Sequence, residues 1–445
     1  MTSPLGNRDF RWLFGAQICS LVGVGLLTVG LSLAAYRIGG AEAAGQVLGL
    51  LLALKMVAYV GLAPLAESLL QAVPRKAALV ALDVGRMVLL IPMAFTTDIW
   101  QIAALSFLFF SMSAGFTPLY QSVIPDVVQE EDLYTKALSW SRVAYTLEAV
   151  LSPVIAGALL TVLDGSSLFL VAALAFSVSI TSILLAQVPK AMTTDGKKPV
   201  LHRASKGLRI YVRTPRLRGL FLLNLALSLS MAWVLVNTVA YAGARLGDSE
   251  RYYPLLMTFY GLGAGLGAFS IPHLVKRIAE RRTMTLGAFA FAACGAVFAT
   301  WPTPGLAALG AIWIGFGLSS SLVLTPGGLV ITRSANTEDR AAVFAAQFSL
   351  SHAGWLLAYP LAGWLATQVS LEMAMLLLSG LTGAVALIAL RVWPAKDPEQ
   401  RVHEHRDLSE DHPHLRNIAA TGPDHSHTHA YHIDDLHPHW DTDRH

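Results

Sequence analysis

The sequence is dominated by apolar runs of about 20 residues, and this pattern decides what kind of protein it can form. Of the 445 residues, 54% are hydrophobic and 14% are charged, whereas water-soluble proteins carry about 25% charged residues. A helix of about 20 apolar residues is long enough to cross the hydrocarbon core of a bilayer. We therefore expect an all-α membrane protein rather than a set of soluble domains.

Turn-forming residues divide the apolar sequence into separate spans. Gly39-Gly40, Asp164-Gly165 and Pro302 to Pro304 are typical of such turns. The first run is too long for the core of a signal peptide, so we interpret it as a retained helix. The twelve predicted spans are 13–35, 44–66, 77–95, 99–122, 137–162, 167–188, 217–242, 253–275, 283–301, 305–331, 342–366 and 372–393.

Lysine and arginine predict the orientation of these spans, because basic loops resist translocation across the membrane. If the N-terminus lies in the cytoplasm, the inward segments before residue 394 hold 20 basic residues and the outward loops hold 3. The outward residues are Arg37, Arg245 and Arg251. We therefore expect both termini to face the cytoplasm.

The sequence also predicts two related halves. The longest loop separates six spans from six, and Pro153 and Gly157 recur as Pro360 and Gly363. The expected units are a six-helix bundle over 1–188, a cytoplasmic linker over 189–216, a second bundle over 217–393 and a tail over 394–445. Two repeated bundles favour a transporter whose binding site lies between them, near the membrane midplane.

Several short stretches resemble one transporter family. Asn7 to Arg11 and Pro125 to Val128 are similar to the branch of the major facilitator superfamily that exports siderophores, macrolides and nickel. The resemblance covers about residues 5–393. In the family's signature loop between its second and third helices, this chain keeps only the terminal basic pair, Arg75-Lys76, after Glu67 and Pro74. The resemblance implies a twelve-helix transporter in the inner membrane of a bacterium, with no enzymatic activity and no resident cofactor.

Two ionisable residues lie near the middle of predicted spans, where a charged group costs about 2.5–3.5 kcal/mol to insert. Glu148 is in the fifth span and His352 in the eleventh, and a shift of 207 residues places His352 opposite Tyr145, within a turn of Glu148. A carboxylate and an imidazole facing one cavity can bind a divalent cation or protons. The structural alternative is a contact between Glu148 and Arg142, with His352 satisfied within the helical core.

Other charged residues are candidates for coupling or gating. The residues assigned to transport and proton coupling are Glu148, His352, Lys55 and Arg142. Lys55, near the middle of the second span, can repel cations from an empty site or pair with Asp83 or Glu148. Asp83 and Arg86 are three residues apart on one helical face and are expected to form a stabilising pair. The residues assigned to the inner gate or its support are Glu67, Arg75, Lys76, Asp83 and Arg86.

Eleven of the fourteen histidines lie in the last 43 residues. Imidazole is the commonest ligand for transition metals, and its reference pKa of about 6.5 leaves it largely neutral near pH 7. The tail is polar, so we expect it to be disordered without metal. A purification tag is the alternative, although tags are usually unbroken histidine runs. The predicted metal ligands are His403, His405, His412, His414, His425, His427, His429, His432, His437 and His439.

With its histidine-rich tail, the chain resembles in particular the nickel-exporting members of the superfamily. This implies a transported divalent cation, nickel or alternatively cobalt or zinc. No ATP-binding glycine-rich loop is present in the sequence. Moving a divalent cation out against an inside-negative potential costs about 4.6 kcal/mol per 100 mV, whereas exchange for two protons cancels this electrical cost. We therefore expect proton antiport, with lipid, metal ion and protons as partners, no nucleic acid, and a monomer.

Two other functions are compatible with the sequence. The same body can serve a proton-coupled exporter of drugs, siderophores or other organic compounds, because fold does not dictate substrate. The chain can also be a membrane-anchored metal sensor or store. Twelve spans argue against the latter, because one span would suffice as an anchor.

Overall fold

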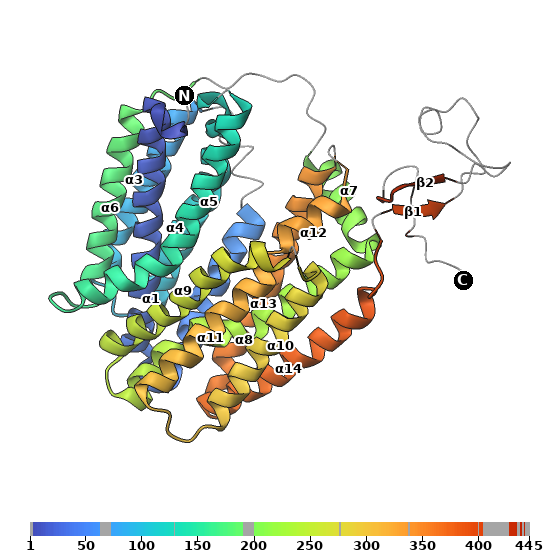
Figure 1. Ribbon diagram of the computed structural model, residues 1–445. Coiled ribbons are helices and arrows are strands. Elements are labelled where there is room, and N and C mark those ends of the chain that lie inside the picture. The colour runs from blue at the N-terminus through green and yellow to red at the C-terminus, as the bar shows by residue number, and fades with distance from the viewer. Residues whose placement is uncertain are drawn as a thin grey trace.

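The computed structural model describes residues 3–62, 73–128, 130–189, 200–275, 277–336, 339–398, 400–403, 427–433, 437 and 440. Long helices account for most of these residues and form two bundles (Figure 1). The first bundle begins with a short 3-10 turn at Pro4–Gly6. Its helices are α1 (Arg8–Val57), the π-helical turn η2 (Ala58–Leu62), α3 (Arg75–Met93), α4 (Ile99–Val127), α5 (Glu131–Leu159) and α6 (Ser167–Leu185).

The second bundle follows the linker between the halves. Its helices are α8 (Pro215–Leu246), α9 (Ser249–Val275), α10 (Glu280–Thr300), α11 (Leu306–Leu324), α12 (Gly327–Ser334), α13 (Arg340–Gln368) and α14 (Leu371–Val392). Within the described part of the chain, eight helical segments are long and apolar enough to cross a membrane. Because α1 makes two passes and α3, α5 and α13 contribute one each, the fold is a twelve-helix multi-pass membrane protein, as the sequence predicts.

The first two passes are two helical segments of α1 that are joined at a kink. Asn7 starts α1 by accepting hydrogen bonds from the amides of Asp9 (2.9 Å) and Phe10 (3.1 Å). The helix turns at Gly40, whose φ of 62° lies in the left-handed region that glycine adopts without a steric penalty. The predicted turn at Gly39-Gly40 is therefore present as a kink.

The internal repeat is visible in two corresponding helices. α5 and α13 each contain 29 residues and an internal proline, Pro153 in one and Pro360 in the other. The two prolines are the residues that the sequence repeat pairs. Glu148 and His352 therefore lie at neighbouring levels of equivalent helices in the two bundles.

Two segments outside the spans contain regular structure. The linker, expected to be a loop, includes the amphipathic helix α7 (Val200–Arg213). α7 lies beside the start of α13, where Lys206 Nζ is 2.6 Å from Asp339 Oδ1. The tail, expected to be disordered, contains an antiparallel pair, β1 (Gln400–His403) and β2 (His427–Ala430).

The two bundles meet at one end of the molecule and diverge toward the other (Figure 1). We call the end that carries Arg8, Arg75 and Arg216 the basic end, and the opposite end, with the turns at Gly40 and Gly247, the far end. At the far end Ser32 Oγ of α1 lies 2.9 Å from the Tyr253 hydroxyl of α9. The two bundles thus contact each other at the far end, and their helices lie farther apart at the basic end.

Candidate transport site

An ionisable side chain from each bundle, Glu148 in one and His352 in the other, interacts with Lys55. The ammonium of Lys55, in α1, interacts electrostatically with the Glu148 carboxylate of α5 and with the His352 ring of α13. All three side chains are half-buried although they occupy the central part of long helices. The structure therefore brings together three of the four residues that the sequence assigns to coupling, Glu148, His352 and Lys55. Lys55 interacts with Glu148 rather than with Asp83.

Glu148 is positioned by a close approach of α1 to α5. Its Oε1 accepts a hydrogen bond from the Ser152 hydroxyl at 3.4 Å. Gly25 of α1 packs directly on Ser152, and a Cβ at residue 25 would lie 2.8 Å from Glu148 Oε1. The absence of a side chain at Gly25 therefore lets the carboxylate sit against the helix–helix contact.

The hydrogen bond made by His352 decides which of its ring nitrogens can bind a ligand. Nδ1 lies 2.7 Å from the Phe348 carbonyl oxygen. Because a carbonyl oxygen only accepts, Nδ1 carries a proton in this contact. In the neutral ring, Nε2 then keeps its lone pair, which is the tautomer suited to binding a metal ion or a second proton.

Aromatic rings surround the charged groups. Lys55 Nζ lies 5.6 Å from the ring centroid of Tyr59 and 5.3 Å from that of Phe110, within the range of cation–π attraction. The Tyr59 ring lies 6.0 Å from the His352 ring, and the Phe348 ring lies 3.9 Å from it. The site thus combines one acid, one imidazole and one amine with a largely aromatic wall.

The predicted gate residues are held within the first bundle. Arg75 forms an ion pair with Asp126 at the end of α4. Lys76 Nζ donates to the carbonyl oxygens of Leu184 (2.7 Å) and Ala186 (2.8 Å), so it caps the end of α6. These contacts fasten α3 to its neighbours at the basic end.

Asp83 and Arg86 form an ion pair inside the same bundle. Their side chains are 0% and 2% exposed. Asp83 Oδ2 accepts a hydrogen bond from Ser179 Oγ at 2.7 Å. The Arg86 guanidinium lies 4.0 Å from the Phe116 ring centroid and 4.7 Å from that of Phe176. This pair supports the packing of α3, α4 and α6.

Some predicted residues fall outside what the structure describes. Glu67 is among them, and so is the side chain of Arg142, although its backbone belongs to α5. His403, His427 and His429 are placed by their backbone in the ribbon, and His432 and His437 are placed with their side chains. The tail ligands outside the described residues are His405, His412, His414, His425 and His439.

The donor set of the described chain is limited. No group of three or more His, Cys, Asp or Glu side chains converges among the residues whose positions are described. The central site therefore offers two protein ligands of the kinds that transition metals accept, a carboxylate oxygen and an imidazole nitrogen. Water or other groups would have to complete the coordination of a cation bound there.

Sequence reasoning missed the closure at the far end. Glu250 of α9 accepts a hydrogen bond from the Gly165 amide at 3.2 Å, which joins the second bundle to a loop of the first. Gly49 of α1 meets α13 so closely that a Cβ there would lie 2.6 Å from the Tyr359 carbonyl oxygen. The Gly45–Gly49 spacing is a known signal of close helix packing and could have indicated this contact.

Comparison with known proteins identifies the family. The family model described as Major Facilitator Superfamily matches residues 13–249 and 221–423. The chain belongs to the Major Facilitator Superfamily. This membership, together with the fold, makes the protein a membrane transporter rather than an enzyme.

A curated relative supports the same family. The chain is 26% identical over 287 residues to the uncharacterized MFS-type transporter y4rN of Sinorhizobium fredii (strain NBRC 101917 / NGR234). The match covers 62% of this chain and 66% of the relative, so it spans slightly less than two thirds of that protein.

Solved transporter structures share the fold. The nucleoside transporter NupG aligns with a TM-score of 0.71 at 13% identity, covering 86% of this chain and 100% of NupG. A bacterial homologue of the human lysosomal transporter Spinster, crystallised in an inward-facing conformation, aligns with a TM-score of 0.67 at 15% identity, covering 87% of this chain and 98% of that one. At these identities the similarity concerns the fold alone.

Proposed function

We propose that this transporter exports a divalent transition-metal cation, nickel or alternatively cobalt or zinc, by proton antiport. The observation that carries the proposal is that Glu148 and His352, from different bundles, both interact with Lys55. The two groups come from different bundles, so a cation held by both is bound at the interface across which the bundles rock. The histidine-rich tail supports a metal rather than another cargo.

The charges of the site permit an electroneutral exchange. In the proton-loaded form, Glu148 is neutral, His352 is an imidazolium and Lys55 is an ammonium, giving a net charge of two positive units. In the metal-loaded form, the carboxylate, the neutral imidazole, the ammonium and the divalent cation also sum to two positive units. Two protons exchanged for one cation therefore leave the charge carried by the protein unchanged, and the proton gradient drives export.

The proposed direction follows from the orientation. We propose that the basic end faces the cytoplasm of a bacterial inner membrane, because lysine and arginine are retained there. The end at which the two bundles diverge would then face the side from which the cargo is collected. The tail would lie on the same side, and we propose that a monomer carries out the cycle.

A second function has an observation of its own in its favour. Lys55 is a fixed positive charge beside the site, and the rings of Tyr59, Phe110 and Phe348 form apolar surface near it. Such surroundings suit an amphipathic organic compound that carries a negative group. Proton-coupled export of an organic compound is therefore the alternative.

Uptake into everted membrane vesicles separates the two functions. The vesicles would be energised with an inside-acid gradient and offered nickel, cobalt or zinc. The metal proposal predicts gradient-dependent accumulation of at least one of these cations, which collapses when the gradient is dissipated. Accumulation of organic dyes with none of the three metals would contradict it, and magnesium serves as the matched divalent control.

A further inference from the structure

Trp440, in the tail, packs on a buried arginine at the basic end of the second bundle. Arg216, in the first turn of α8, is 2% exposed. Its guanidinium carbon lies 5.0 Å from the centroid of the Trp440 ring, which is a cation–π distance. A residue near the C-terminus thus packs on the start of a helix more than 200 positions earlier in the sequence.

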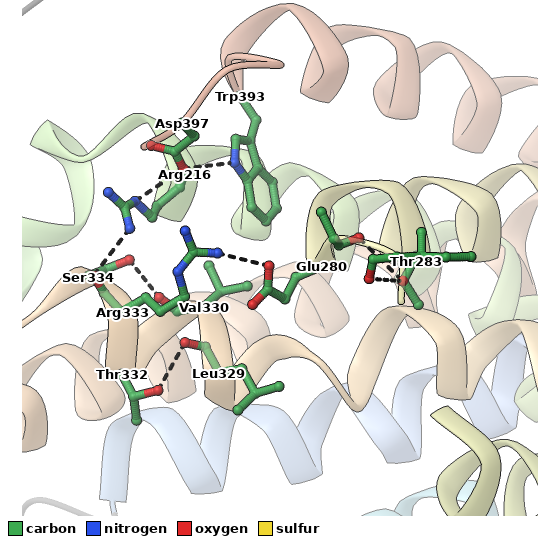
Figure 2. Close-up of polar contacts among 12 residues, drawn as sticks. Arg216, Glu280, Thr283, Leu329, Val330, Thr332, Arg333, Ser334, Trp393 and Asp397 are labelled. Atoms are coloured by element: carbon green, nitrogen blue, oxygen red, sulfur yellow. Dashed lines mark hydrogen bonds and ion pairs between the residues drawn. The ribbon is translucent and has the colours of Figure 1, made fainter. Parts of the chain in front are cut away.

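Arg216 is the centre of a polar network that joins four elements (Figure 2). Its Nε is 3.3 Å from Asp397 Oδ2, and its Nη1 donates to the Arg333 carbonyl oxygen at 3.1 Å. Asp397 also accepts from the Trp393 indole at 3.3 Å, and Arg333 pairs with Glu280 at 2.8 Å. The network therefore ties the basic ends of α8, α10 and α12 to the segment that follows α14.

The tail residues around Trp440 form a small apolar unit. Tyr431 and Ile433 are 6% and 2% exposed and belong to the main hydrophobic core. The Tyr431 ring lies 4.9 Å from the His437 ring and 5.7 Å from the Trp440 ring. We call Tyr431, Ile433, His437 and Trp440 the clasp, because they attach the tail to the bundle.

One clasp residue is also a predicted metal ligand. His437 is 3% exposed and stands edge-on to Tyr431. To join several tail histidines around one cation, its ring nitrogen must come within about 2.1 Å of the metal. The His437 ring is buried and packed against Tyr431, so a cation and further ligands can reach its nitrogen only if the ring leaves this position.

The ribbon next to the clasp provides further histidines. His403 of β1 and His427 of β2 are register partners, and His429 is the partner of Arg401. Residues directly opposite in an antiparallel pair have Cβ atoms about 4.5–5.5 Å apart. Because β2 ends at Ala430 and the clasp begins at Tyr431, a cation held at the ribbon lies next to the clasp in sequence.

We propose that docking of the clasp on Arg216 and chelation of a divalent metal by the tail histidines exclude each other, so that metal releases the tail from the second bundle. The two states share His437, and by linkage any ligand that binds the released tail more tightly shifts the population toward release. The proposal rests on the metal-binding part of the proposed function and adds a metal-sensing role to the tail.

Distance measurement on the full-length protein in detergent tests the proposal without transport. Spin labels would be placed by Thr428→Cys in the ribbon and Arg391→Cys at the end of α14, with Cys19 and Cys294 replaced by serine. Zinc is the probe, because nickel is paramagnetic. We expect one short distance without metal and a longer, broader distribution with zinc.

Three variants and one control decide how the result is interpreted. Trp440→Ala and Arg216→Gln should give the longer distribution without zinc, whereas Arg218→Gln, a matched change at an exposed arginine two residues away, should not. His437→Phe keeps an aromatic ring against Tyr431 and removes the ligand that the two states share, so the short distance should persist when zinc is added. An unchanged short distance at zinc concentrations that saturate the tail by calorimetry, or a docked tail in both the Trp440→Ala and Arg216→Gln proteins, would overturn the proposal. Metal transport in vesicles can persist in that case, which keeps the two failures distinguishable.

Discussion

The rings of Tyr59 and His352 face each other across the two bundles, with their centroids 6.0 Å apart. Tyr59 lies in η2, directly after α1, and His352 lies in the middle of α13. Lys55, one helical turn before Tyr59, interacts with His352 and with Glu148. A change in protonation or in bound ligand at this junction therefore alters the interactions of both bundles.

Replacing Glu148 by glutamine should uncouple transport from protons. Glutamine keeps the size and the hydrogen bond to Ser152 but cannot release a proton or neutralise a cation. We expect nickel flux under an acid gradient to fall by tenfold or more, equivalent to about 1.4 kcal/mol or more. Glu372→Gln is the control, since Glu372 pairs with Arg245 in a partly exposed ion pair and lies outside the site. Equal flux in the wild type and the Glu148→Gln protein would exclude a coupling role.

Replacing Lys55 by methionine should strengthen nickel binding and slow turnover. The ammonium repels a cation that enters beside Glu148 and His352, and removing one nearby charge is worth about 1–2 kcal/mol at intermediate dielectric. Calorimetry at pH 8, where protons compete less, should show about tenfold tighter binding. Lys55→Arg retains the charge and should bind nickel like the wild type. Weaker binding in the methionine variant would show instead that Lys55 supports the cargo, as expected for an organic anion.

Replacing Gly49 by alanine should open the far end. The new Cβ would lie 2.6 Å from the backbone carbonyl oxygen of Tyr359, which cannot rotate away, so α1 and α13 must separate at a cost of about 1–3 kcal/mol. Labels at Asp164→Cys and Asp248→Cys should report a longer distance between the bundles. Gly380→Ala, where no heavy atom lies within 4 Å of the new Cβ, should leave that distance unchanged. A longer distance in both variants would remove the assignment of Gly49 to the closure.

Replacing Asp83 by asparagine should destabilise the first bundle. The change leaves the Arg86 guanidinium buried without its carboxylate, and breaking a buried pair costs about 3–5 kcal/mol. The thermal unfolding midpoint in detergent should fall by several degrees. Arg245→Gln removes a partner from a half-exposed pair and should shift the midpoint little, because such pairs contribute about 1 kcal/mol or less. Similar midpoints for both variants would mean that Asp83 is not a structural support.

Much of the architecture was predictable because the bilayer imposes it. The helical spans follow from the cost of exposing a polar backbone to lipid, and the six-plus-six division follows from the long loop and the internal repeat. The placement of Glu148 and His352 at neighbouring levels of equivalent helices followed from the repeat. The interaction of Lys55 with Glu148 was one of the alternatives that the sequence left open, whereas its interaction with His352 was not foreseen.

Other features depend on contacts between distant segments, which periodicity does not encode. The aromatic partners of Arg86 come from α4 and α6, and the seat of Trp440 on Arg216 joins two ends of the chain. The composition indicated a disordered tail because most tail residues are polar. It could not show that the apolar residues Tyr431 and Ile433 are buried. The helix in the linker was missed because its apolar residues are interrupted by charges.

Purified protein in liposomes gives the most direct test of the central claim. The liposomes would hold a pH-sensitive dye, an imposed inside-acid gradient and no other ion path, and nickel would be added outside. The account predicts nickel entry accompanied by the exit of about two protons per cation, and no coupled proton movement in the Glu148→Gln protein. The account would be contradicted if nickel, cobalt and zinc all failed to enter liposomes that contain the wild-type protein and none of them caused proton movement.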